Sequence, residues 1–177
     1  MQRAAGTLLE ENHRPLFARE ATMNALNLHA EPLQDAWLDA YGHLNEAYYL
    51  VPFSRATWAY QNHFGIGDAF LTETGGALYT VETHLRYLRD VRAPAQIEIE
   101  TYTLACDAKR LHIAHRMLVD ETERATFECI GVHVDSKVGK TAPWPAEVLS
   151  TLSGLCLPEA DWPEWSGRRV SMKRNQT

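Results

Sequence analysis

The residues best suited to chemistry lie in one short segment, residues 39–46, which reads Asp-Ala-Tyr-Gly-His-Leu-Asn-Glu. The pattern places this segment between the end of a strand and the start of a helix. The first backbone N–H groups of a helix lack partners within the helix and carry positive partial charge, so they can stabilise an oxyanion that forms on a carbonyl. The upstream carboxylate of Asp39 can activate water or attack the carbonyl itself, and Gly42 allows close approach of the backbone.

The same residue types also have a purely structural interpretation. Asp39 and Asn45 belong to the types that cap turns and helices, and that role alone would explain their presence. His43 would either orient water and substrate or hydrogen-bond the turn. Spacing alone leaves both interpretations open.

A long helix is predicted directly after this segment. Between residues 45 and 64, one stripe of a helix with about 3.6 residues per turn carries Tyr49, Phe53, Ala56, Tyr60 and Phe64. Asn45 suits the N-cap of this helix, and Gly65 suits its end. Pro52 removes one backbone donor inside the span and therefore predicts a kink.

Extended segments lie on both sides of that helix. Residues 28–37 are strand-like, although Pro32 interrupts them. After a loop that holds Gly75 and Gly76, four further strands are expected over residues 77–87, 97–106, 110–119 and 125–135, followed by a short helix over 146–155. This order predicts an α+β protein with the hotdog architecture, in which a five-stranded antiparallel sheet wraps a long central helix.

Length and composition indicate one globular domain. The chain has 177 residues, of which 45% are hydrophobic and 23% are charged, which argues against disorder and against a fibrous protein. We expect a lead-in over residues 1–27, a single domain over residues 28–157 and a polar C-terminal tail over residues 158–177.

Charge and hydropathy exclude two classes of partner. The formal net charge is −6, whereas a protein dedicated to nucleic acid needs a basic face. No uncharged apolar run approaches the roughly 18–20 residues that a membrane span requires. Glu10 and Glu11 interrupt the opening segment before the apolar part of a leader can form. We therefore expect no nucleic acid, no membrane and a cytoplasmic location.

Cysteine and histidine give no metal-binding pattern. Cys106, Cys129 and Cys156 are odd in number and widely spaced, so we expect buried thiols and no disulfide framework. His112 and His115 are the nearest approach to a metal-binding pair, but residues three apart on a strand point to opposite faces. No metal and no cofactor are expected.

The helix-start segment resembles the signature D-x-x-G-H-x-N-N-x-x-Y-L of hotdog acyl-CoA thioesterases related to hydroxybenzoyl-CoA thioesterase. The matching positions are Asp39, Gly42, His43, Asn45, Tyr49 and Leu50. The resemblance extends over residues 28–145 and includes Val81-Glu82-Thr83-His84, Lys109-Arg110-Leu111-His112 and His133-Val134-Asp135. It implies hydrolysis of an acyl-CoA thioester, with Asp39 as general base or nucleophile and with His43 and Asn45 in the same site.

Glu46 departs from this signature, which has a second Asn there. A Gly-His-x-Asn-Glu cluster with a Val-Glu-Thr-His strand is similar to the betainyl-CoA thioesterases of carnitine breakdown. The trimethylammonium group of a betainyl substrate cannot donate a hydrogen bond, so a carboxylate and aromatic faces suit it. The expected substrate-binding box is Glu46 with Tyr41, Tyr48 and Trp58, unless these aromatic residues belong to the core or to a dimer interface.

Two further sets of residues have an expected role in binding or pairing. The phosphates of CoA are expected to meet basic residues at loops and strand ends, namely Lys109, Arg110, Lys137 and Lys140. For any one of them taken alone, a solvated surface cation is the simpler explanation. Glu82 and His84 share one face of their strand, either as an ion pair or with His84 in the core.

Together these observations predict a cofactor-free thioesterase for a short polar acyl-CoA, with betainyl-CoA as the leading substrate. Exposed sheet edges predict a homodimer, alone or paired into a tetramer. The alternatives are a hotdog thioesterase for another acyl-CoA, a hotdog hydratase, for which no separate Asp and His pair is visible, and a non-catalytic module that binds acyl-CoA or quaternary ammonium groups. Release of free CoA thiol would distinguish an enzyme from a binding module.

Overall fold

The computed structural model describes residues 25–172, so most of the expected lead-in lies outside the described residues. The strands are β1 (Leu26–Pro32), β2 (Gly76–Tyr87), β3 (Gln96–Cys106), β4 (Arg110–Val119), β5 (Thr122–Asp135) and β6 (Lys140–Thr141). The α-helices are α1 (Leu50–His63), α2 (Asp68–Thr74) and α3 (Ala146–Leu155), and the short 3-10 helices are η1 (Asp35–Trp37), η2 (Glu46–Tyr49) and η3 (Glu159–Asp161).

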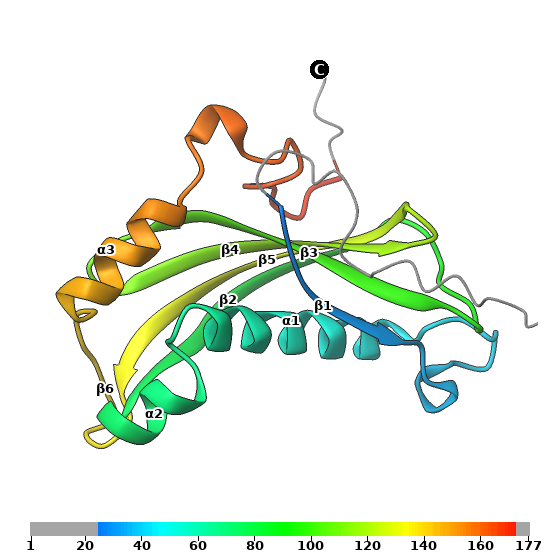
Figure 1. Ribbon diagram of the computed structural model, residues 1–177. Helices are drawn as coiled ribbons and strands as arrows, with labels where there is room; N and C mark the ends of the chain where they lie inside the picture. Colours follow the sequence, from blue (N-terminus) through cyan, green and yellow to red (C-terminus); the bar gives the residue numbers. More distant parts are fainter. Residues whose placement is uncertain (1–24, 173–177) are drawn as a thin grey trace, which may run out of the picture.

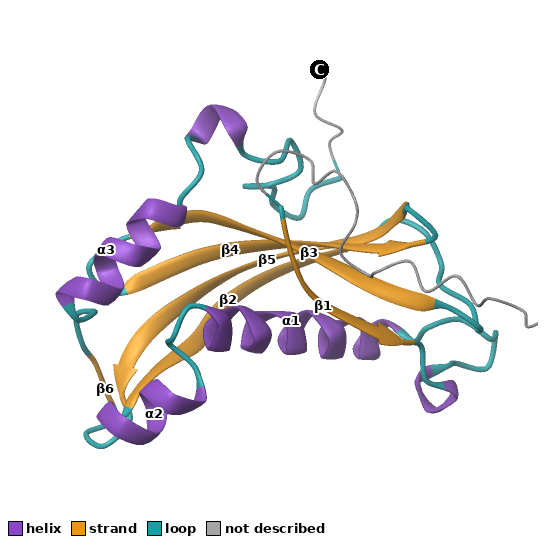
Figure 2. Ribbon diagram, in the orientation of Figure 1, coloured by secondary structure: helices purple, strands orange, loops and turns teal. Residues whose placement is uncertain are grey.

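The strands form one curved antiparallel sheet in the order β1-β3-β4-β5-β2, with the two-residue β6 added to β5. Helix α1 lies along the concave face of this sheet, and the chain after α3 lies on the opposite side (Figure 1). The expected α+β architecture with five main strands is confirmed, as Figure 2 shows by its colouring of helices and strands. Helix α2 and strand β6 are additions that the sequence pattern did not predict.

The predicted stripe of α1 forms the centre of the main core. Phe53, Ala56 and Tyr60 have no exposed surface, and the ring of Phe53 stacks on Phe127 of β5 with 5.1 Å between the ring centroids. Every second residue of β4 from Leu111 to Val119 is buried toward the same core. Each large side chain buried in this way contributes about 1.5–3 kcal/mol of hydrophobic stabilisation, so the stripe holds α1 on the sheet.

The start of the helix differs from the expectation. Residues 46–49 form the 3-10 helix η2, whose N-cap Asn45 accepts a hydrogen bond from the Ala47 N–H at 3.0 Å. Helix α1 begins only at Leu50, so Pro52 lies in its first turn, where backbone N–H groups have no partner within the helix. The expected kink is therefore wrong, whereas Gly65, at φ +71°, ends the helix as predicted.

A buried polar chain also fastens α1 to the sheet. The Thr57 hydroxyl donates to the Phe53 carbonyl at 3.0 Å and accepts from Nε2 of His115 at 2.9 Å. Nδ1 of the same imidazole then accepts from the Thr101 hydroxyl at 2.9 Å. Complete burial lowers the pKa of His115 to about 3, so this histidine is neutral and links α1, β4 and β3.

The first strand and the last segment also depart from expectation. Strand β1 ends at Pro32, and residues 35–37 form η1 in place of the expected strand end, because Pro32 cannot donate to a sheet ladder. The segment expected to be a polar tail carries Trp162 and Trp165, which pack with Leu157 on the outer face of the sheet.

Among residues 25–172, no helix is both long and apolar enough to cross a membrane.

His112 and His115 lie on opposite faces of β4, as the strand period predicted. Nε2 of His112 donates to the Glu128 carboxylate at 2.7 Å on the outer face, and the Gly167 N–H donates to the same carboxylate at 2.9 Å. Burial raises the pKa of Glu128, but these two hydrogen bonds outweigh it and hold that pKa below its usual value. His84 borders this cluster from β2 and is half-buried, so the expectation of a core histidine there is wrong.

The three cysteine thiols differ in burial, whereas the sequence predicts that all three are buried. Cys129 is buried in the main core, whereas Cys106 and Cys156 are only half-buried. The expectation of three buried thiols is wrong because two of them lie at the margin of α3, where the core ends.

Candidate active site

Asp39 organises the turn that precedes the helix. Its Oδ1 accepts hydrogen bonds from the backbone N–H groups of Tyr41 at 2.8 Å and His43 at 3.1 Å. The Asp39 carbonyl accepts from the Gly42 N–H at 3.0 Å, and Gly42 has a φ of +75°, which favours glycine. The hydrogen bond from the His43 N–H is the main cause that holds the pKa of Asp39 below its usual value, so the carboxylate is ionised at neutral pH.

Long-range backbone contacts place this turn beside the end of β2. The Leu44 N–H donates to the Val91 carbonyl at 2.8 Å, and His43 forms an isolated β-bridge with Arg92. The Tyr87 hydroxyl, at the last position of β2, donates to the Glu46 carbonyl at 3.2 Å. Residues more than forty positions apart in the chain thus share one site.

A pocket of about 420 Å³ opens beside Asp39. Its charged and aromatic lining comes from the helix-start segment and from the loop after β2: Asp39, Glu46, Tyr49, Tyr87, Arg89 and Asp90. The rings of Tyr49 and Tyr87 meet edge to face, with 5.1 Å between their centroids. The pocket therefore combines three carboxylates with aromatic surface.

Carboxylates outnumber guanidinium groups in the lining of this pocket, where Asp39, Glu46 and Asp90 lie with Arg89. Burial first, and then the charge of Asp90, raises the pKa of Tyr49, while burial and the charge of Glu46 raise the pKa of Tyr87. Arg92 donates to Asp90 at 2.8 Å and neutralises part of its charge, and Nε2 of His43 lies 3.5 Å from the same carboxylate. Glu46 has no such cationic neighbour among the salt bridges of the described residues.

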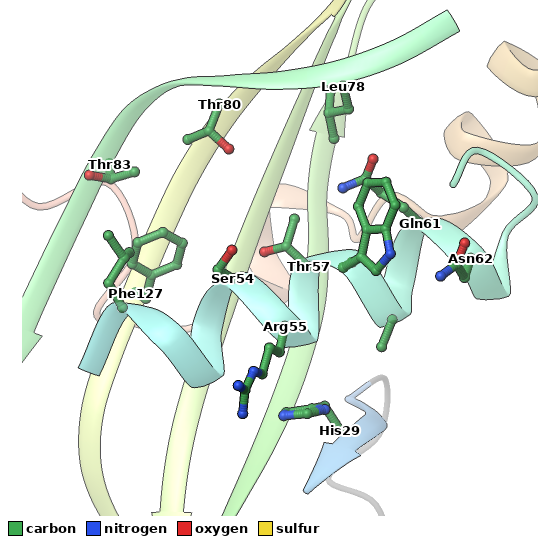
Figure 3. Close-up of a pocket in the computed structure, with 13 residues that line it drawn as sticks. His29, Ser54, Arg55, Thr57, Gln61, Asn62, Leu78, Thr80, Thr83 and Phe127 are labelled. Carbon is green, nitrogen blue, oxygen red and sulfur yellow. The ribbon is translucent and has the colours of Figure 1, made fainter. Parts of the chain in front are cut away.

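The aromatic residues expected around Glu46 lie elsewhere. Tyr41 is 82% exposed, and Tyr48 stacks on Trp37 with 6.2 Å between the ring centroids. Trp58 lines a different groove of about 700 Å³ between α1 and β2, whose lining side chains Figure 3 shows. The expectation that these three residues surround Glu46 is therefore corrected: the aromatic residues that line its pocket are Tyr49 and Tyr87. Successive residues at the start of a helix point to different sides, so neighbours of Glu46 in the sequence do not share its pocket.

The basic residues expected to bind CoA lie at the other end of the sheet. Lys109 lies in the turn before β4, and Arg110, the first residue of β4, pairs with Asp107. Lys137 and Lys140 follow β5, near Gly76. Tyr87 at the active-site end of β2 and Ala77 near the other end are ten residues apart, which is about 33 Å at 3.3 Å per residue. One chain therefore does not bring these cations to Asp39.

The comparisons with known proteins agree with this geometry. The model of the thioesterase-like superfamily matches residues 33–152. The chain belongs to this superfamily. A betainyl-CoA thioesterase from Pseudomonas aeruginosa strain PAO1 is 35% identical over 154 residues, which cover 83% of this chain and 95% of that protein. An L-carnitine dehydrogenase/betainyl-CoA thioesterase from Agrobacterium fabrum strain C58 is 34% identical over 96% of this chain.

The chain spans only 36% of the length of the Agrobacterium fabrum relative. Among solved structures, a Staphylococcus aureus protein in complex with CoA has a TM-score of 0.74 at 19% identity and covers 85% of this chain and 98% of its own. A Pseudomonas putida KT2440 protein, described as a candidate thioesterase, has a TM-score of 0.72 at 29% identity and covers 86% of this chain and 99% of its own. The fold is thus the hotdog thioesterase fold, and the thioesterase relatives support a thioester hydrolase.

Sequence reasoning missed the four pocket residues that come from the end of β2 and the loop after it: Tyr87, Leu88, Arg89 and Asp90. A partial signal was present, because Tyr87 ends a predicted strand and a charged loop follows it. That signal gave no indication that this loop meets the Asp39 turn, since the contact depends on pairing between residues 43–44 and 91–92.

Proposed function

We propose that this protein is an acyl-CoA thioesterase in which Asp39 carries the chemistry. The observation that supports it most is an ionised carboxylate at a helix start, in the wall of an open pocket, in a chain of the thioesterase-like superfamily. Asp39 deprotonates the attacking water or attacks the thioester carbonyl itself, and both routes require the carboxylate form. CoA leaves as a thiol, and the acyl group leaves as a carboxylic acid. A cytoplasmic location, expected from the sequence, belongs to this proposal.

The proposed substrate is betainyl-CoA, whose hydrolysis gives glycine betaine and CoA. Its trimethylammonium group lies one methylene away from the thioester carbonyl, so it must enter the same pocket as Asp39. Glu46 and Asp90 supply negative charge there, and Tyr49 and Tyr87 supply aromatic surface for a cation that cannot donate hydrogen bonds. The relatives named betainyl-CoA thioesterase, at about 35% identity, support the same substrate.

We further propose a homodimer formed through the edge of β2. Within residues 25–172, no strand pairs with the outer edge of β2, and Tyr79 and Val81 are 53% and 61% exposed there. Such an edge is a template for pairing with a second copy. The neighbouring groove between α1 and β2, which Trp58 helps to line, gives the second copy a further surface to cover. Figure 3 shows Leu78 and Phe127 in the same groove.

Two-fold antiparallel pairing of β2 would also explain where the basic residues lie. Such pairing places the Tyr87 end of one strand opposite the Gly76 end of its partner. Lys137, whose side chain lies against Gly75, then approaches the Asp39 pocket of the other copy. The anionic phosphates of CoA would bridge the two subunits, with the cations supplied by the chain that does not supply Asp39.

A thiol-release assay tests the proposed activity. The panel pairs betainyl-CoA with 3,3-dimethylbutyryl-CoA, in which a neutral tert-butyl group replaces the trimethylammonium group at nearly the same size. We expect turnover of both, with kcat/KM higher for betainyl-CoA by about tenfold or more. Equal kcat/KM values would contradict the proposal that the site recognises a cationic acyl group. Saturable binding of both esters without thiol release would show that the protein is a non-catalytic binding module.

A further inference from the structure

Two cysteines that are fifty positions apart in the sequence lie in contact in the fold. Cys106 is the last residue of β3, and Cys156 caps the C-terminus of α3. Their sulfur atoms are 3.6 Å apart. The thioesterase site lies at the opposite end of the sheet, so this pair takes no part in the chemistry proposed for Asp39.

The backbones that carry both sulfurs are held in place by their own contacts. The Leu157 N–H, next to Cys156, donates to the Thr103 carbonyl at 3.0 Å and ties the end of α3 to β3. The Cys156 thiol lies 3.3 Å from the Leu152 carbonyl, and the sulfur of Cys106 lies 3.4 Å from the Ser153 hydroxyl. Both thiols are half-buried, so the pair borders solvent at the margin of the core.

We propose that Cys106 and Cys156 form a redox modification site, in which a two-electron oxidant of the peroxide class joins the two sulfur atoms in a reversible disulfide. One thiol attacks the peroxide and becomes a sulfenic acid, with release of one water. The second thiol attacks that sulfur, and a second water leaves as the S–S bond forms. Two thiols are oxidised, and one hydrogen peroxide is reduced to two waters.

The resting state of this site is the dithiol. Burial, and then the adjacent Cys106, raise the pKa of Cys156 to about 12, so its thiol is protonated at neutral pH. Bond formation needs the sulfurs to approach from 3.6 Å to about 2.05 Å, while the hydrogen bond from the Leu157 N–H to the Thr103 carbonyl keeps the two segments together.

The disulfide would alter the stability of one region. It links α3 to the end of β3, next to the turn that holds Lys109, and it closes a loop of fifty residues. A cross-link of this length restricts the unfolded chain strongly, so the oxidised protein should melt about 5 °C or more above the reduced protein.

Oxidation of the purified full-length chain tests the proposal. Hydrogen peroxide should lower the free thiols, counted in denaturant, from the three of the sequence to one per chain. The intact mass should fall by two hydrogens, and peptide mapping without reductant should find Cys106 joined to Cys156. Dithiothreitol should restore three thiols and the original melting temperature.

Cysteine variants provide the matched controls. Cys129→Ala removes the buried thiol and should leave the mass loss, the linked peptide and the rise in melting temperature unchanged. Cys106→Ser and Cys156→Ser should each abolish all three. A wild-type protein that yields sulfinic acid at Cys106 without a cross-linked peptide, or a cross-link that includes Cys129, would overturn the proposal.

Discussion

Asp39 has two roles that depend on the same hydrogen bonds. The N–H groups of Tyr41 and His43 shape the turn by donating to its carboxylate, and the second of these bonds is the main reason that its pKa is lowered. The capping interpretation and the catalytic interpretation of this residue are therefore compatible. A variant that separates the two roles must keep an acceptor oxygen and lose the charge.

Asp39→Asn is that variant. The amide oxygen of Asn can still accept from Tyr41 and His43, so we expect unchanged folding and an unfolding free energy within about 1 kcal/mol of the wild type. Loss of the basic, nucleophilic carboxylate should lower kcat by at least about a hundredfold, with binding of the CoA ester retained. Steady-state thiol release and calorimetric binding measure the two effects. A variant that keeps more than about a tenth of kcat would make Asp39 a structural cap.

The variant Glu46→Gln tests whether one carboxylate recognises the positive charge of the proposed substrate. Glu46→Gln should lower kcat/KM for betainyl-CoA by about fivefold relative to 3,3-dimethylbutyryl-CoA, because Glu46 is exposed in the described chain and exposed charge pairs contribute about 1 kcal/mol. Glu159→Gln, which removes an exposed carboxylate on η3, is the matched control and should change neither substrate. Equal losses on both substrates would show that Glu46 does not recognise charge.

At the scale of elements, α1 is held to the sheet by an apolar stripe and by one buried imidazole. The stripe is a local pattern and was predicted from the spacing of residues such as Phe53 and Tyr60. The bonds from Thr57 through His115 to Thr101 join three elements, and they leave His115 neutral in the core. Because His115 must stay neutral in the folded state, the stability of the contact between α1 and the sheet depends on pH.

His115→Gln should make the protein less sensitive to acid. The pKa of His115 is about 3 in the folded chain and about 6.5 when it is exposed, so only the unfolded state takes up this proton between those values. Below pH 6.5 the wild type should lose about 1.4 kcal/mol of unfolding free energy per pH unit through this group. Gln offers both threonines a partner but does not titrate.

Urea unfolding between pH 7 and pH 4.5 measures that slope. The variant should show a shallower slope, together with a loss of about 1–3 kcal/mol at pH 7 from imperfect hydrogen bonding. The exposed His63, at the end of α1, supplies the control His63→Gln, which should keep the wild-type slope. A slope that is unchanged in His115→Gln would assign the acid sensitivity to other groups.

At the scale of the whole molecule, the proposed active site needs a second chain. Light scattering should give a mass of about 40 kDa, which is twice the 20.1 kDa of one chain. Val81→Lys should shift this mass toward that of one chain, because a two-fold axis near the middle of β2 would bring two lysines together. Its kcat/KM should fall with the mass, since Lys137 of the other chain would no longer reach the pocket.

Ala160→Lys is the control, because Ala160 is exposed on η3, which lies beyond α3 on the side of the sheet opposite α1 (Figure 1). This variant should remain a dimer with wild-type activity. A wild-type protein that is a fully active monomer of about 20 kDa would contradict the dimer and the shared CoA site together.

The sequence by itself determined the features that depend on neighbours a few residues apart. The helical stripe of α1, the alternation along β4, the bounds of α3 and the cap at Asn45 follow from periods of 3.6 and 2 residues and from local hydrogen bonding. The Asp39 turn belongs to this group, since its partners lie two and four residues away.

Only the tertiary structure decided what stands around that turn. Strand pairing brings Tyr87 and Asp90 to Glu46 and separates Lys137 from Asp39. The packing of the end of α3 against β3 brings the thiols of Cys106 and Cys156 into contact. The short helix α2, between Gly67 and Gly75, has too few residues for its period to register in the sequence. Contacts of these kinds depend on which strands pair and in which register, and side-chain spacing along one chain does not contain that information.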